Sequence, residues 1–292
     1  MRRGLWKNEN VKQHNKKVKS KNEKIFFPFD LIAFALSKIE KKSKFQKIPR
    51  YILAKKNLEV ILKREVTEEE IDSVFFFHTL YLVQLITFKP LMKYGAEIIT
   101  DEKEEKNLLY QIRNKGVICV SAHLGIPESA SILFTEKGAE IFVLVENLKS
   151  KIQNIFFSRT RKSFGLNPLT SFKKMVEEIK SGSRNKIFVF LVDRPIPNSK
   201  DIEIFGEKSK MTDLPFRLSS KFNLKVFGVS AVRDSKLKIP PRTSVSNWKI
   251  KLKIREIESF RDMVRFIERE IYENYVEWNP FFIFPFTKIC QE

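Results

Sequence analysis

Several residue types on which common protein chemistries depend are scarce in this chain. The 292 residues include two cysteines and three histidines. Cys119 and Cys290 cannot supply a disulfide framework, and so few cysteines suit a reducing compartment. The histidines, His14, His78 and His123, are too dispersed along the sequence to suggest a metal cluster. We therefore expect no disulfide scaffold, no bound metal and no cofactor.

Several familiar motifs are also missing. The sequence contains no G-x-S-x-G elbow, no Walker phosphate loop, no G-x-G-x-x-G and no C-x-x-C. These absences exclude the commonest serine hydrolase, nucleoside triphosphatase, dinucleotide-binding and redox classes. A long Gly/Ser linker and internal repeats are absent too, whereas 42% apolar residues provide for a substantial core.

Positive charge is plentiful and unevenly distributed. The formal net charge is +20, and residues 1–64 hold 19 Lys and Arg against 5 Asp and Glu. Such a segment attracts nucleic acid, anionic lipid or an acidic protein, and charge alone does not choose among them.

An apolar stretch, residues 25–36, lies inside this basic segment. It is shorter than the ~20 residues needed to cross a bilayer, but an aromatic-rich helix between cationic flanks can lie in the interface of an anionic leaflet. The alternative is a core helix with a solvated lysine face. A charged 24-residue lead and the lack of a small-residue cleavage site argue against a signal peptide.

A strand that ends at a histidine is the strongest functional signal. Residues 117–122 form an apolar run with β-branched members, bounded by Gly116 before and by Gly125 and Pro127 after. His123 therefore lies at the carboxyl end of a predicted strand, which is where open α/β sheets bind ligands.

Glu128 follows this histidine by five residues. Residues five apart on one helix diverge by roughly 140°, so His123 and Glu128 can converge only across a turn, with Pro127 at the first helical position. A carboxylate placed there can bind one imidazole nitrogen and raise the pKa of the ring above about 6.5, which suits a general base. Alternatively, Glu128 caps a helix and His123 is an ordinary turn residue, and the spacing does not decide between the two.

Other polar candidates follow along the chain. The predicted strand 186–192 also ends on a charged residue, Asp193, and a predicted helix before Gly165 carries Arg159 and Arg161. Taken singly, each signal is weak, because an Asp after a strand is often a cap and an Arg near a helix end is usually at the surface.

The apolar periodicity predicts an α/β fold. We expect a single layered domain with a central, mostly parallel sheet flanked by helices, together with a basic helical N-terminal layer. The expected parts are a basic tail over 1–24, a membrane-associating helical layer over 25–94 and an α/β domain over 95–292. The predicted helices are 38–64, 68–94, 127–137, 150–164, 170–181, 211–222 and 259–274. The predicted strands are 117–122, 141–146, 186–192 and 224–232, with a further pair within 236–258.

In order and spacing these residues resemble the lysophospholipid acyltransferase superfamily, and within it the bacterial lipid A biosynthesis acyltransferases, the lauroyl and myristoyl transferases. The resemblance spans most of the chain. Residues 116–128 resemble the family's His-x4-Asp/Glu block, and Arg159 and Arg161 before Gly165 resemble its arginine block. The remaining similar blocks are 54–58 with 67–70, 191–194, and Phe205-Gly206 with 211–220.

The resemblance implies transfer of a fatty acyl chain from an acyl thioester to a hydroxyl of a membrane lipid, such as a lipid A precursor or a lysophospholipid. His123 is then the general base and Glu128 orients it. Arg159 and Arg161 hold a phosphate. Asp193 and Gly206 are substrate-binding residues by family position, with Gly206 admitting backbone N–H groups to an oxyanion.

The implied partners are acyl carrier protein or coenzyme A as the thioester, an acceptor glycolipid or lysophospholipid, and an anionic membrane surface, with no nucleic acid. The implied location is the cytoplasmic face of the bacterial inner membrane, as a peripheral or monotopic protein.

The chain also departs from the family pattern. Ile126 and Pro127 stand where the family commonly has Asn-Trp, and the C-terminal Trp followed by His-Arg-Arg is reduced to Trp278 and an apolar tail. Two alternatives therefore stay open: a non-catalytic basic protein that binds membrane or nucleic acid, and a lipid or thioester hydrolase that uses the same His and Glu on water.

Overall fold

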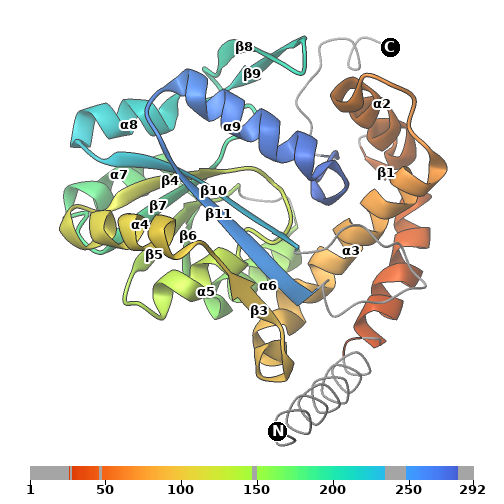
Figure 1. Ribbon diagram of the computed structural model, residues 1–292, viewed down its shortest axis with the longest axis horizontal. Coiled ribbons are helices and arrows are strands. Elements are labelled where there is room, and N and C mark those ends of the chain that lie inside the picture. The colour runs from red at the N-terminus through yellow and green to blue at the C-terminus, as the bar shows by residue number, and fades with distance from the viewer. Residues whose placement is uncertain (1–25, 27, 46–47, 147–149, 234–247, 282–292) are drawn as a thin grey trace, which may run out of the picture.

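A twisted seven-stranded sheet forms the centre of the molecule (Figure 1). The computed structural model describes residues 26, 28–45, 48–146, 150–233 and 248–281. The strand order is β3-β11-β10-β4-β7-β5-β6, and every neighbouring pair is parallel except β10 with β11. The mostly parallel α/β sheet expected from the sequence is thereby confirmed. Its strands are β3 (Glu97–Ile99), β4 (Val117–Ser121), β5 (Glu140–Leu144), β6 (Leu166–Leu169), β7 (Lys186–Leu191), β10 (Lys225–Arg233) and β11 (Lys249–Ile257).

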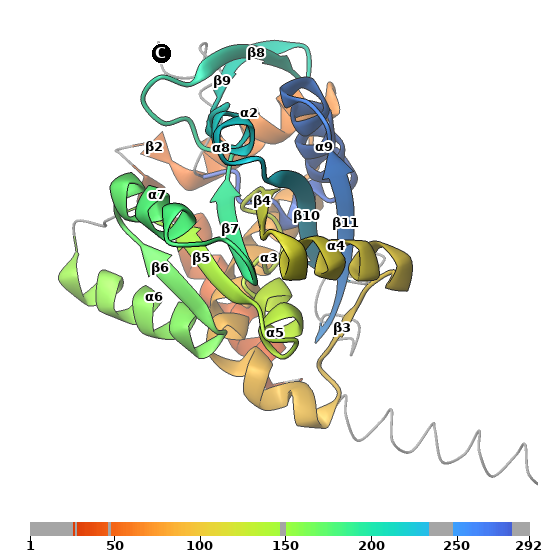
Figure 2. The same cartoon turned by 90° about the vertical axis from the view of Figure 1, so that its left-hand side faces the viewer.

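Helices cover both faces of this sheet (Figures 1 and 2). Because side chains alternate across a strand, Ile118 and Val120 of β4 pack into one core cluster, whereas Val117 and Cys119 pack into the other. Burial on both faces explains why the central strands read as continuous apolar runs. The flanking helices are α4 (Glu102–Asn114), α5 (Ser129–Thr135), α6 (Lys151–Ser163), α7 (Phe172–Lys180), α8 (Leu214–Phe222) and α9 (Phe260–Glu273).

The N-terminal layer is helical but not continuous. Residues 28–41 are helical, and they are followed by β1 (Lys44–Phe45), β2 (Ile48–Pro49), α2 (Arg50–Leu62), α3 (Glu68–Leu91) and η1 (Met92–Tyr94). The predicted unbroken helix over 38–64 is therefore wrong. Pro49 has no backbone N–H to donate and disfavours a helical conformation in the residue before it, so the chain pairs as a short hairpin instead.

The start of α3 confirms the helix predicted from residue 68. The Thr67 side chain accepts from the Glu70 N–H, and the Glu70 carboxylate accepts from the Thr67 N–H, which makes a capping box. By length and composition alone, the stretch Glu68–Tyr94 could span a membrane; 61% of the tested window is buried inside the protein, as in a core helix.

Several elements escaped prediction or lie beyond the description. Helix α4, strands β3 and β6, and the hairpin of β8 (Lys200–Ile204) with β9 (Glu207–Met211) were not expected, because α4, β8 and β9 are rich in charged residues and strands β3 and β6 are short. Of the strand pair expected within 236–258, β11 is confirmed. The basic tail 1–24, residues 234–247 and Cys290 lie outside the described residues.

A buried ion pair joins the sheet to the helical layer. Arg233, the last residue of β10, donates to Glu277 at 2.7 Å and to Gln84 of α3 at 2.6 Å, and its side chain is fully buried. Glu277 ends the short helix η3 (Tyr275–Glu277). The C-terminal segment is thereby held against both the sheet and α3.

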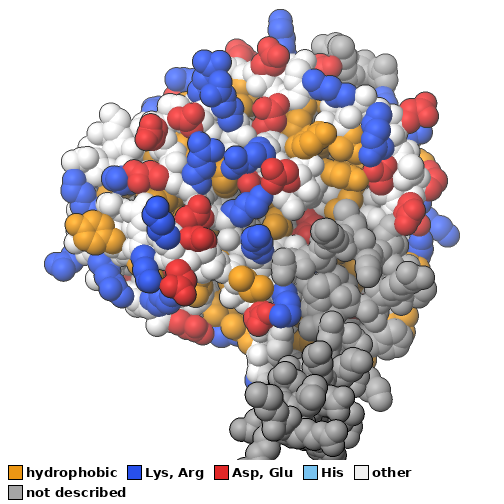
Figure 3. Space-filling view, in the orientation of Figure 1, with side chains coloured by type: hydrophobic (Ala, Val, Ile, Leu, Met, Phe, Trp, Pro, Cys, Tyr) orange, Lys and Arg blue, Asp and Glu red, His pale blue; other side chains and the backbone are white. Residues whose placement is uncertain are grey.

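The surface varies in character from one element to another. Over α4, β11 and α9, Lys and Arg are interspersed with Asp and Glu (Figure 3). The surface of helical residues 28–41 is different, because one face of this helix is apolar and exposed. Asp30, Ala33 and Ser37 of the same helix are buried. The exposed apolar side chains there are Leu31, Ile32, Leu36 and Ile39, with exposed fractions of 53%, 49%, 44% and 70%.

Candidate active site

His123 lies at the carboxyl end of β4, in the middle of the sheet. Its ring Nδ1 is 2.8 Å from Asp193 Oδ1, and its backbone N–H donates to Asp193 Oδ2 at 2.8 Å. Asp193 follows β7, which is the parallel neighbour of β4, so the two side chains meet although they are 70 residues apart in sequence. A carboxylate acceptor favours the tautomer in which Nδ1 carries the proton.

The C-terminal segment closes this pair from another side. Trp278 Nε1 donates to Asp193 Oδ2 at 3.0 Å, so the carboxylate receives hydrogen bonds from the ring and backbone of His123 and from an indole. The backbone N–H of Asn279 donates to the His123 carbonyl at 2.9 Å, and Gly125 N–H donates to the Glu277 carbonyl at 3.0 Å. The histidine turn is thus fixed by backbone hydrogen bonds to residues 277–279.

The environment favours a charged histidine and a charged aspartate. Burial lowers the pKa of His123, but the charge and hydrogen bond of Asp193, with a contribution from Glu128, outweigh it, so the pKa lies above its usual value. Burial raises the pKa of Asp193, but His123 and Trp278 outweigh that effect, so the pKa lies below its usual value. An ionised Asp193 holding a titratable imidazole is a usual arrangement for a general base.

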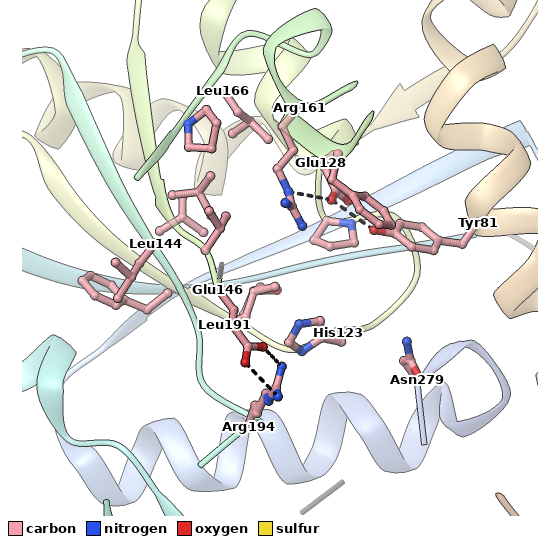
Figure 4. A pocket seen from close by; sticks show the side chains of 18 of the residues that line it. Tyr81, His123, Glu128, Leu144, Glu146, Arg161, Leu166, Leu191, Arg194 and Asn279 are labelled. Carbon is pink, nitrogen blue, oxygen red and sulfur yellow. Dashed lines mark hydrogen bonds and ion pairs between the residues drawn. The ribbon is translucent and has the colours of Figure 1, made fainter. Parts of the chain in front are cut away.

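Glu128 lies beside His123 but has other partners (Figure 4). Its Oε1 accepts from the Tyr81 hydroxyl at 3.1 Å and lies 3.7 Å from Arg161 Nε. We expected Glu128 to hold the imidazole. At Nδ1 this expectation is corrected, because that nitrogen is hydrogen-bonded to Asp193. The reason is topological: Glu128 sits at the N-cap of α5, facing α3 and α6, whereas adjacent parallel strands place Asp193 next to the ring.

Among the described residues, one carboxylate oxygen of Glu128 is left without a hydrogen-bond partner. The side chain is buried, and Oε2 lacks a hydrogen-bond partner in the part of the chain that the structure describes. A buried acceptor without a donor costs free energy, so this oxygen is suited to accept from a bound molecule.

Two arginine–glutamate pairs flank His123 (Figure 4). Arg161, near the end of α6, pairs with Glu128 and stacks over Phe157. Arg194, directly after Asp193, pairs with Glu146 beyond the end of β5. The sequence patterns did not single out Arg194 and Glu146 as site residues; the signal that could have found them is their position at the ends of neighbouring parallel strands.

His123 opens into a cavity of 1360 Å³. Beneath the histidine it runs along one face of the sheet, where alternate residues of the central strands line it. On the other side it reaches the helical layer at Glu40, Arg50 and His78. The predicted residue Arg159 lines the cavity as well and is exposed. The apolar lining includes Cys119, Phe134, Ile141, Val143, Leu166, Ile187 and Val189.

Comparison with known families decides the identity. The family model for bacterial lipid A biosynthesis acyltransferase matches residues 24–281. The chain belongs to the bacterial lipid A biosynthesis acyltransferase family. This confirms the resemblance found in the sequence, and membership supports an enzyme that performs acyl transfer.

Other comparisons add little to this family assignment. Among solved structures, the chain is similar to the 1-acyl-sn-glycerophosphate (LPA) acyltransferase, PlsC, from Thermotoga maritima. The identity is 14% and the TM-score is 0.36, over 85% of this chain and 96% of the other. A search of curated proteins finds no match.

The structure places Gly206 away from the cavity of this acyltransferase family member and Cys119 in the cavity wall. Gly206 occupies the turn between β8 and β9, where Phe205 and Gly206 both have positive φ, as a two-residue hairpin turn requires. It is not among the residues that line the cavity. Cys119 does line the cavity, but burial raises the pKa of its thiol to about 12, so it is no thiolate nucleophile at neutral pH.

Proposed function

We propose that this protein transfers a fatty acyl chain from an acyl thioester to a hydroxyl group of a membrane glycolipid such as a lipid A precursor, with His123 as the general base. The observation that carries the proposal is the His123–Asp193 pair, fixed at the sheet edge and opening into a large cavity lined mainly by apolar side chains.

The chemistry follows from the protonation of this pair. With Nδ1 bonded to Asp193, proton transfer runs through Nε2, which takes the proton of the acceptor hydroxyl as its oxygen attacks the thioester carbonyl. The carbon–oxygen bond forms, the carbonyl becomes an oxyanion, and collapse breaks the carbon–sulfur bond. The departing sulfur takes the proton back from Nε2. A thioester is already activated, so the enzyme needs no Ser or Cys nucleophile.

The shape of the cavity suits this pair of substrates. Its 1360 Å³ exceeds the roughly 300–1,000 Å³ typical of a site for one small molecule. Lining residues of β7 run from Ile187 to Leu191, a length of about 13 Å at the rise of a strand. We assign this apolar part to the acyl chain, and the polar part around His123 to the reacting groups.

Charged residues beside His123 then bind the polar parts of the substrates. Arg161, with Arg159 nearer the surface, offers a guanidinium to a phosphate of donor or acceptor. Glu128 fixes Arg161 and presents its unpartnered Oε2 to a hydroxyl of the acceptor. Arg194 lies on the other side of His123 in the same cavity and offers a second guanidinium to the substrates (Figure 4). Asp193 acts on His123 rather than on substrate, and Gly206 has no part in this site.

The N-terminal layer provides the membrane contact in this proposal. The exposed apolar face of residues 28–41 lies within a segment of high positive charge, which suits the interface of an anionic leaflet. The same charge attracts an acidic acyl carrier protein. The location that follows is the cytoplasmic face of the inner membrane.

Lipid mass spectrometry tests the substrate directly. Cells with the gene should contain a glycolipid heavier by one acyl chain than cells without it, and the mass difference identifies both the chain length and the acceptor. Purified protein should release free fatty acid no faster than it acylates the acceptor. A protein that cleaves the thioester equally fast without acceptor would be a hydrolase instead.

A further inference from the structure

Asn279 lies directly opposite His123 in the cavity. Its backbone N–H donates to the His123 carbonyl. Residues 277–279 therefore run alongside the histidine turn and place Asn279 next to His123. The side chain is 8% exposed and lines the same cavity (Figure 4). It therefore belongs to the wall against which the reacting groups lie.

The orientation of the Asn279 amide is fixed by its oxygen. Oδ1 accepts from the backbone N–H of Phe281 at 3.2 Å, and an N–H can only donate, so the oxygen and nitrogen are assigned without ambiguity. The Nδ2 group points to the cavity side (Figure 4). Within the described ranges it has no hydrogen-bond acceptor, which leaves an amide donor beside His123.

The backbone N–H groups of residues 123–126, which form the histidine turn, all donate within the protein. The N–H groups of residues 123–126 donate, in order, to Asp193, Ala122, Glu277 and Ala231, and Pro127 has no N–H. The usual source of an oxyanion hole, consecutive backbone N–H groups, is thus occupied at this turn.

We propose that Asn279 Nδ2 is the donor that stabilises the oxyanion. This inference rests on the acyl transfer proposed above. When the acceptor oxygen attacks the thioester carbon and His123 takes its proton, the π electrons of the carbonyl move to its oxygen, and Nδ2 donates to that oxygen. On collapse the carbonyl re-forms and the sulfur leaves with the proton from His123. A preorganised donor of this kind acts mainly in the transition state.

Two substitutions separate this role from a structural one. Asn279→Ala removes both the donor and the acceptor for Phe281. Asn279→Asp keeps an oxygen for Phe281, but it replaces the donor with a carboxylate oxygen whose negative charge opposes an oxyanion. We expect both to lower kcat by roughly 10²- to 10³-fold, with KM for the thioester and for the acceptor changed little. In Asn279→Ala the acid limb of the pH profile should stay in place, because the His123–Asp193 pair is untouched.

The control is Asn167→Asp, the same change at an exposed position of β6 that does not line the cavity. It should leave kcat unchanged. If Asn279→Asp restores wild-type kcat, the residue is structural and the inference is wrong; wild-type kcat in Asn279→Ala would overturn the inference as well. If the wild-type protein transfers no acyl chain to any glycolipid, the proposed function itself fails, which is a separate result.

Discussion

At the scale of single residues, the pairing of His123 with Asp193 sets the protonation of the site. The raised pKa of His123 means that the imidazole becomes the neutral base only above its usual pKa near 6.5. Activity should therefore rise with pH through an acid limb displaced upward from 6.5. By the same linkage, the stability that His123 contributes through its raised pKa is fully present below its unfolded pKa and is lost as pH rises through its folded-state pKa. The stability that Asp193 contributes through its lowered pKa is present above its unfolded pKa and is lost as pH falls through its folded-state pKa.

Replacement of Asp193 tests this pairing. In Asp193→Asn the charge that raises the pKa of His123 is gone and burial remains, so the acid limb should move to lower pH. The ring also loses its fixed tautomer, and kcat should fall on the order of 10²-fold or more. The matched control is Asp201→Asn in β8, an 88% exposed side chain, which should change neither. An unmoved acid limb in Asp193→Asn would contradict the assignment.

Trp278 should act through Asp193. Trp278→Phe keeps a buried ring but removes the donor to Asp193 Oδ2, so kcat should fall roughly tenfold, the value of one hydrogen bond to a charged group. Trp248→Phe is the matched control, because Trp248 is equally buried and donates to Asp30 away from the site. Both variants should lose stability, and only Trp278→Phe should lose kcat. Equal kinetic effects would mean that Trp278 only packs.

His123, Glu128, Arg159 and Arg161 line one cavity. The position of His123 followed from the end of a predicted strand, whereas the two arginines on α6 were singled out through the family resemblance. We expected Glu128 to be the carboxylate that orients His123, because it is near His123 in the sequence. The actual partner at Nδ1 depends on which strands are neighbours, and strand order is a property of the whole sheet. Asn279 could not have been found for the same reason, since only the closure of residues 277–279 over the turn brings it to His123.

At the scale of elements, the helix over residues 28–41 has two faces with different tasks. Its buried face packs through Ala33 and Asp30, and Asp30 accepts from Trp248. Its exposed face presents Leu31 and Ile39 to the surroundings. The sequence left open whether the apolar stretch 25–36 lies at a membrane interface or in the core, and it could not show which residues face outward, because the apolar run is continuous.

Charges on the exposed face should weaken membrane binding without unfolding the protein. We expect the double variant Leu31→Glu, Ile39→Glu to bind anionic vesicles at least tenfold more weakly in flotation, because each side chain contributes about 1.5–3 kcal/mol when buried in an apolar phase. Tyr110→Glu, at a 64% exposed position of α4, is the control and should bind like the wild type. Unchanged flotation of the double variant would place the membrane contact elsewhere.

Element boundaries show where sequence patterns suffice. Helices α6, α7, α8 and α9 lie within two or three residues of their predicted ranges, because their apolar residues recur with the helical period. The hairpin of β1 and β2 was missed because Lys-rich residues around Pro49 carry no strand alternation.

At the scale of the whole molecule, a basic helical layer and an α/β sheet meet around one cavity. The buried Arg233–Glu277–Gln84 contacts bind these parts together close to the histidine turn. Under the proposed function, this arrangement brings the membrane-facing helix, the apolar part of the cavity and the general base close together, as acylation of a membrane lipid requires.

The most direct test of this account is the rate of acyl transfer by His123→Ala. Purified wild-type protein, acyl carrier protein thioester and glycolipid acceptor in anionic vesicles should give a product heavier by one acyl chain. His123→Ala should bind the vesicles equally well and form this product about 10²- to 10⁴-fold more slowly. Product formation by His123→Ala at the wild-type rate would contradict the account.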